Sequence, residues 1–83
     1  MHSKQGWKVE TEDGEMREVR ANRTPNGWRF QSRLKGVREW TRHDPPLVED
    51  VRYLHDMMER KYVRRRTSLK VVQDVKKLLD SLV

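Results

Sequence analysis

The N-terminal half of the chain alternates apolar and polar side chains with a period of two, the pattern of a half-buried β-strand. The alternation is clearest over residues 28–35, where every second side chain is Trp28, Phe30, Ser32 or Leu34. Shorter alternating stretches cover residues 7–10, 17–22 and 37–42, and Gly- or Pro-containing turn signals separate them. The sequence therefore predicts an antiparallel β-meander of three to four strands over residues 7–43, and we expect residues 1–6 to be disordered.

Turn chemistry sets the expected register of each hairpin. A turn closed by Gly14 places Trp7 opposite Val19, and a Pro25-Asn26 turn places Ala21 opposite Phe30 and Glu18 opposite Arg33. For the last hairpin, a two-residue Lys35-Gly36 loop would set Arg33 opposite Arg38, an unfavourable like-charge pair. A three-residue loop with Gly36 in the left-handed region instead sets Phe30 opposite Trp40, and we expect this register.

These registers predict a sheet with one apolar and one polar face. The apolar face would collect Trp7, Val9, Val19, Ala21, Trp28, Phe30 and Trp40, with Arg17, Arg38 and Arg42 at its margins. The polar face would collect Lys8, Glu10, Glu18, Arg20, Gln31, Arg33 and Glu39.

The second half changes to a helical period. Leu47, Val51, Leu54, Met58 and Tyr62 recur every three or four residues after Asp44-Pro45-Pro46, where we expect Asp44 to cap the helix. Thr67 or Ser68 can cap a second helix, whose apolar positions are Leu69, Val71, Val72, Val75, Leu78, Leu79 and Leu82. The predicted fold is α+β: one small domain, residues 1–83, in which a β-meander is followed by an α-helical hairpin over residues 45–83. We expect the hairpin to pack on one face of the sheet.

Composition narrows the function classes. The chain has 83 residues, of which 34% are apolar and 39% charged, and its net charge is +6. With no cysteine it holds no disulfide framework and no thiolate zinc site. No apolar run approaches the roughly 20 residues of a membrane span. We therefore expect a cytoplasmic protein with no membrane partner, no cofactor and no small-molecule substrate.

Positive charge gathers in two blocks. Residues 17–42 and residues 60–83 each hold eight basic and two acidic side chains. Arginine outnumbers lysine, and its planar fork suits phosphate and carboxylate groups. The pattern predicts that nucleic acid or another polyanion is bound through Arg20, Arg29 and Arg33 and through Arg64, Arg65 and Arg66. A solvated basic face without a ligand remains open as the alternative.

Other chemistry has weaker signals. The three tryptophans are more typical of the core than of a stacking platform for single-stranded nucleic acid. His55 and Glu59 have the helical spacing of two metal ligands, but no third ligand follows, so we expect no metal site. No nucleophile elbow, Gly-rich phosphate loop or isolated carboxylate pair is present, so we expect no catalysis. Tyr53 and Met57 lie beside the main apolar stripe and form either the seam between the helices or a surface for a protein partner or homodimer.

The stretch Gly27-Trp28-Arg29-Phe30 with Lys35-Gly36, and the order of elements over residues 16–62, resemble the arm-binding DNA-binding domains and their relatives. The resemblance is one of topology and composition. It implies that the sheet would contact the major groove of DNA, while the second helix is additional to that pattern.

Overall fold

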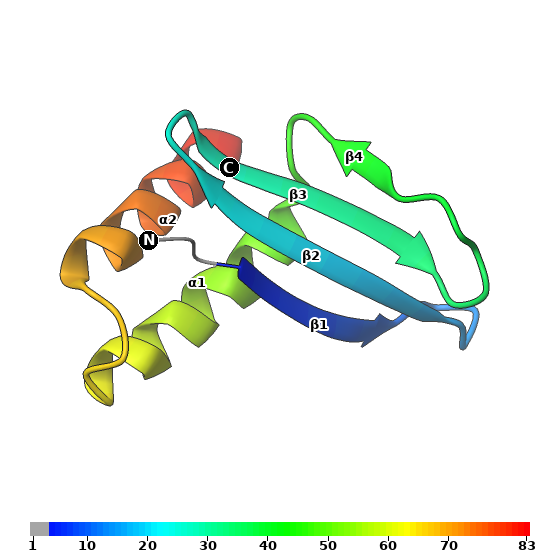
Figure 1. Cartoon of the computed structure of the whole chain (residues 1–83), viewed down its shortest axis with the longest axis horizontal. Helices are drawn as coiled ribbons and strands as arrows, with labels where there is room; N and C mark the ends of the chain where they lie inside the picture. The colour runs from blue at the N-terminus through cyan, green and yellow to red at the C-terminus, as the bar shows by residue number, and fades with distance from the viewer. Residues whose placement is uncertain (1–3) are drawn as a thin grey trace. The chain divides into compact units, whose positions relative to one another are not determined.

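A computed structural model describes residues 4–83 as four strands and two helices (Figure 1). The strands are β1 (Lys4–Glu10), β2 (Met16–Thr24), β3 (Gly27–Leu34) and β4 (Thr41–His43). They form one antiparallel sheet in sequence order, followed by the helices α1 (Val48–Val63) and α2 (Leu69–Leu82). The α+β class, the meander and the helical hairpin are thereby confirmed. The chain divides into two compact units, residues 1–44 and residues 45–83, and each is described by itself below.

The first strand begins earlier than the alternation predicts. Residues 4–6 already pair with β2, with Gly6 opposite Arg20. The expected disorder of residues 1–6 therefore does not extend over this part of the chain, and residues 1–3 lie outside the described residues.

The first two hairpins have the predicted registers. Trp7 lies opposite Val19, and Ala21 lies opposite Phe30. Glu18 is flanked by Lys8 on one side and by Arg33 on the other. Both turns confirm that short loops rich in Gly, Pro, Asn and Asp determine the pairing of the strands that they join.

The register expected for the third hairpin is wrong. Phe30 lies opposite His43 rather than Trp40, a shift of three residues. Gly36 does adopt a positive φ of 90°, and the Val37 amide donates to the Leu34 carbonyl at 3.0 Å, but the chain does not pair again until Thr41. Because side chains alternate between faces, an odd shift moves Trp40 from the apolar to the polar face.

The apolar face carries the buried side chains of the sheet. Val19, Ala21 and Phe30 are at most 2% exposed, and Trp7 is 9% exposed. Val9 and Trp28 are half-buried on the same face. The alternation of the sequence thus identified the buried face correctly, with Trp40 as the exception.

The first helix begins later than the proposed cap. Its N-cap is Leu47, without a side-chain cap hydrogen bond, rather than Asp44. A residue that precedes proline is disfavoured in the helical region, so Asp44 and Pro45 both stay outside the helix. Glu49 and Asp50 lie in the first turn, where negative charge suits the helix dipole.

The two helices pack against each other through part of each predicted stripe. Val51, Leu54 and Met58 are buried in α1, while Leu47 and Tyr62 at the ends of its stripe are exposed. In α2, Val71, Val72 and Val75 are buried, and Leu69 is 48% exposed. Of the two candidate caps of α2, Thr67 and Ser68, the structure has Ser68, whose hydroxyl accepts from the Val71 amide at 3.4 Å.

Candidate functional site

The polar face of the sheet is built from three rows of side chains that lie across the strands. One row runs from Gly6 through Arg20 and Gln31 to Arg42. The neighbouring rows are Lys8–Glu18–Arg33 and Lys4–Asn22–Arg29. Successive rows lie about 7 Å apart, because two residues of a strand separate them. We call this surface the arginine face and define it by Arg20, Arg29, Arg33 and Arg42.

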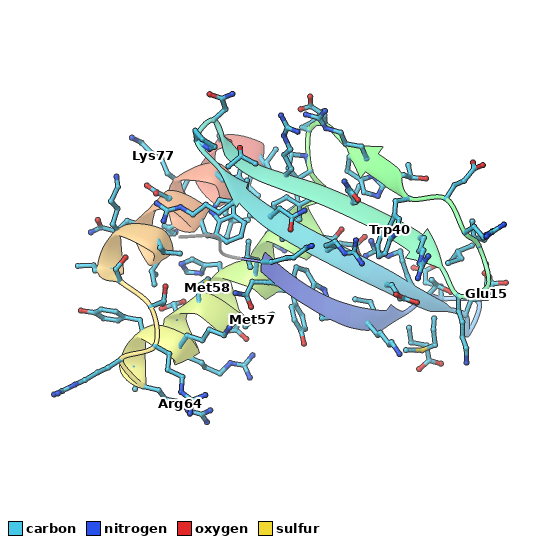
Figure 2. All side chains as sticks on the ribbon, in the orientation of Figure 1. Glu15, Trp40, Met57, Met58, Arg64 and Lys77 are labelled. Carbon is cyan, nitrogen blue, oxygen red and sulfur yellow. The ribbon has the colours of Figure 1, made fainter. Side chains whose placement is uncertain are left out.

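Trp40 joins two of these arginines. The guanidinium carbon of Arg20 lies 4.3 Å from the centroid of the Trp40 ring, and that of Arg33 lies 4.6 Å from it. The two guanidinium groups come from different strands, β2 and β3, and Trp40 comes from the segment that leads into β4 (Figure 2). Attraction between a cation and the face of the indole ring holds all three side chains together.

Arg33 has two further contacts. One of its terminal nitrogens lies 3.5 Å from a carboxylate oxygen of Glu18, its cross-strand partner. The other donates to the Arg38 carbonyl at 3.3 Å. With both side chains about one-third exposed, the ion pair is screened by water and contributes little to stability. Its structural effect is to limit the directions in which the Arg33 guanidinium can point.

Arg29 and Arg42 differ from Arg33 in their neighbours. Both are exposed, and their cross-strand partners are the neutral Asn22 and Gln31. Within residues 4–83, neither side chain has an ion pair or a side-chain hydrogen bond. The register thus leaves two guanidinium groups on this face with their donors directed to solvent.

The three rows carry a clear excess of positive charge. Their ionisable side chains are the basic Lys4, Lys8, Arg20, Arg29, Arg33 and Arg42, and only one of their members, Glu18, is acidic. Like charges that share one face of a sheet repel one another. A polyanion would relieve that repulsion.

The second predicted cluster, Arg64, Arg65 and Arg66, lies in the turn between α1 and α2. The Arg65 amide donates to the Tyr62 carbonyl at 2.8 Å, and the Arg66 amide donates to the Lys61 carbonyl at 2.7 Å. These two hydrogen bonds form a Schellman motif, in which the residue after the C-cap adopts a left-handed conformation. That residue is Arg65, with a φ of 59°. Glycine is favoured at this position, so an arginine there costs about 1 kcal/mol of stability.

The turn arginines are exposed and chemically free to bind. In the part of the chain that the structure describes, none of the three side chains has an ion pair or hydrogen bond. Figure 2 marks Arg64 at the end of α1. Of the predicted polyanion-binding residues, Arg20, Arg29 and Arg33 are brought together on the arginine face, and Arg64–Arg66 form a separate group in the helical unit.

Ser32 and His43 make a contact that sequence reasoning missed. The Ser32 hydroxyl lies 2.6 Å from Nε2 of His43, on the face opposite the arginines. A serine beside a histidine can serve as a nucleophile with its base, but Ser32 is only 5% exposed. We interpret the contact as a hydrogen bond that helps to fix the β3–β4 register.

The remaining candidate residues lie on α1. Tyr53 is 44% exposed and Met57 is half-buried, while the neighbouring Met58 is buried. Nδ1 of His55 lies 3.1 Å from Oε1 of Glu59, as the helical spacing of the two residues predicts. Within residues 4–83, no group of three or more potential ligands could hold a metal ion.

Sequence reasoning missed Arg42 of the arginine face and the adjoining Trp40. Trp40 and Arg42 were both assigned to the apolar side, because the expected register was displaced by an odd number of residues. Avoidance of Arg–Arg pairs could not have identified this register, because the expected register already sets Arg33 opposite the neutral Val37.

Comparisons of the chain with protein-family models, with curated proteins and with solved structures give no match. Among the described residues, no helix is long and apolar enough to cross a membrane.

Proposed function

We propose that this protein is a non-catalytic binding module whose arginine face holds the phosphate backbone of a nucleic acid. The observation that carries the proposal is the combination of Arg29 and Arg42, which have no ion-pair partner within residues 4–83, with Arg20 and Arg33, which are held over Trp40. Guanidinium groups form paired hydrogen bonds with phosphate oxygens, and several on one surface can follow a backbone. The turn arginines Arg64–Arg66 would provide a second contact of the same kind. The cytoplasmic location expected from the sequence stays a prediction.

Phosphate contacts give affinity without base recognition. Each contact that neutralises a phosphate releases condensed counterions, so binding weakens steeply as salt concentration rises. A face with four arginines predicts strong salt dependence and little dependence on base sequence. DNA and RNA are distinguished by the experiment rather than by the proposal.

The proposal is tested by fluorescence anisotropy with labelled duplex DNA, duplex RNA and single-stranded oligonucleotides over a range of salt concentrations. The variant Arg29→Glu with Arg42→Glu removes two exposed guanidinium groups and introduces two carboxylates. We expect it to lose binding at physiological salt. At low salt, the slope of log affinity against log salt for duplex DNA should become shallower by about 2, one for each lost contact.

The matched control is Arg52→Glu with Lys77→Glu, which changes the net charge equally but lies on the two helices (Figure 2 labels Lys77). If the control weakens binding as much as the arginine-face variant, net charge alone is responsible and the proposed face is wrong. If the arginine-face variant binds like the wild type, the proposal also fails.

The contribution of the turn is tested separately with Arg64→Gln and Arg66→Gln. Both variants leave the Arg65 conformation in place. A further loss of affinity, with a slope reduced by about 1 for each substitution, would assign phosphate contacts to the turn. Unchanged affinity would restrict binding to the sheet.

A second candidate function is a protein interaction or homo-oligomerisation module. It is favoured by the exposed apolar side chains of the helical unit, among them Tyr53 at 44% and Val63 at 81%. Sedimentation equilibrium over a range of protein concentrations tests for self-association. If Tyr53→Ser with Met57→Ser dissociates an oligomer, and nucleic acid is not bound, this second function replaces the first.

A further inference from the structure

We propose that Arg20 and Arg33 form one phosphate subsite and that Trp40 is the positioning residue that assembles it. The inference rests on the proposed function and deepens it, because it assigns one phosphate group to one pair of side chains. It also gives Trp40 a role in binding the backbone instead of a role in stacking on bases.

The guanidinium groups of Arg20 and Arg33 both lie close to the ring of Trp40. Because both guanidinium carbons are close to the same centroid, at 4.3 and 4.6 Å, they can be no further apart than the sum of these two distances. The two side chains start from neighbouring strands, on adjacent rows of the arginine face. Trp40 thus keeps two sets of planar N–H donors beside one ring, and the proposed subsite requires that a single tetrahedral anion accept from both.

Trp40 lowers the cost of bringing the two charges together. An arginine side chain in solvent loses considerable rotamer freedom when it binds a ligand. Here the indole ring already restricts Arg20, and the ring, Glu18 and the Arg38 carbonyl together restrict Arg33. The ring attracts both cations in the free protein, so the pair does not have to be assembled when phosphate arrives.

The same contacts argue against base stacking by Trp40. Both guanidinium groups lie over its ring, and the side chain is half-buried. The other sheet aromatics, Trp7, Trp28 and Phe30, belong to the apolar face. The geometry therefore assigns Trp40 to the organisation of phosphate ligands.

Glu18 is the competing anion of this subsite. Its carboxylate lies 3.5 Å from Arg33, in the space on the face where a phosphate oxygen would take its place. A dianionic or backbone phosphate that engages both arginines displaces this weak, one-third exposed ion pair at little cost. Removing the carboxylate should therefore strengthen phosphate binding.

The test compares a probe without bases with one that has them. Affinities of the full chain for inorganic polyphosphate and for a single-stranded oligonucleotide are measured for the wild type, Trp40→Leu and Trp40→Phe. Trp28→Leu is the control, because it removes a half-buried tryptophan from the opposite face. Thermal denaturation of each variant shows whether it is folded at the temperature of the measurement.

We expect Trp40→Leu to weaken binding of both probes by the same factor, roughly two- to fivefold, the equivalent of an exposed cation–π contact. Trp40→Phe should recover part of that loss, and Trp28→Leu should bind as the wild type does. In NMR spectra, the Nε–H resonances of Arg20 and Arg33 should lose their ring-current shift in Trp40→Leu. In the wild type the same resonances should move when polyphosphate is added.

Three results would overturn the inference. Polyphosphate binding that is unchanged in Trp40→Leu would show that the ring does not organise the arginines. A loss confined to the oligonucleotide would show that Trp40 stacks on bases. Wild-type protein that binds neither probe would refute both the subsite and the proposed function. If polyphosphate binds in a Trp40-dependent way and nucleic acid does not, the subsite stands and the proposed function fails.

A second variant tests the subsite without touching Trp40. Glu18→Gln frees Arg33, and Glu10→Gln changes the net charge equally without a contact to Arg33 among the described residues. We expect Glu18→Gln to raise polyphosphate affinity more than Glu10→Gln does. Equal gains from the two variants would contradict the assignment of Glu18 as the competing anion.

Discussion

The two faces of the sheet are made by the same strands, yet one face is buried and the other is largely exposed. On the apolar face, Val19, Ala21 and Phe30 are almost completely buried. On the arginine face, Arg29 and Arg42 are exposed and have neutral cross-strand neighbours. Alternation along each strand thus separates a face that stabilises the fold from a face that stays exposed to solvent.

The largest expected effect is on the apolar face. Phe30→Ala removes a side chain that is 0% exposed, and it should destabilise the protein by about 3–5 kcal/mol. Urea denaturation followed by circular dichroism measures this change. A loss below about 1 kcal/mol would show that the apolar face does not form the core of the sheet.

Trp40 should behave differently from Phe30. Its two cation–π contacts are at the protein surface, so Trp40→Ala should cost only about 1–2 kcal/mol. The same denaturation measurement compares the two variants directly. Equal losses for Trp40→Ala and Phe30→Ala would place Trp40 in the core, as the sequence first predicts, and would contradict the β3–β4 register.

Loop length decides which strand registers of the sheet can be predicted from the sequence. The registers of β1–β2 and β2–β3 could be derived from sequence, because each loop has a turn type that fixes the pairing on both sides. The third hairpin has a turn at Gly36, but residues 37–40 separate that turn from β4. Nothing local determines how many residues such a segment consumes, so Trp40 and Arg42 were placed on the wrong face.

In the helical unit, too, some features could be predicted from the sequence and others could not. Spacing predicted both helices and limited the cap of α2 to Thr67 or Ser68, of which Ser68 is the cap, since these features depend on local periodicity and on one side chain. The left-handed Arg65 could not be predicted, because glycine is the usual signal for that conformation. The candidate site was therefore found in part: Arg20, Arg29 and Arg33 follow from composition and alternation, while the positions of Trp40 and Arg42 depend on the β3–β4 pairing.

A smaller effect is expected at the turn between the helices. Arg65→Gly relieves the left-handed conformation of a non-glycine residue and should stabilise the protein by about 1 kcal/mol. Arg64→Gly at the C-cap, where φ is −86°, is the matched control and should not stabilise. Thermal denaturation of the two variants measures this difference in stability. A destabilised Arg65→Gly would mean that the Arg65 side chain has a structural role.

The smallest effect on stability is expected on the arginine face. Arg29→Gln removes an exposed charge with no ion-pair partner in residues 4–83, so stability should change by less than about 0.5 kcal/mol. Affinity for nucleic acid should fall, and the salt slope should decrease by about 1. A variant that loses stability but keeps its affinity would reverse the division of tasks between the two faces.

The most direct test of that division is an amide-resolved NMR titration of the full chain with a random-sequence DNA duplex and with single-stranded RNA. Each ligand is added at low and at physiological salt. We predict salt-sensitive shifts in β2, β3 and β4 at the residues of the arginine face and at Trp40, with smaller shifts at Val19, Ala21 and Phe30. If neither ligand moves any of these resonances at low salt, the arginine face does not bind nucleic acid.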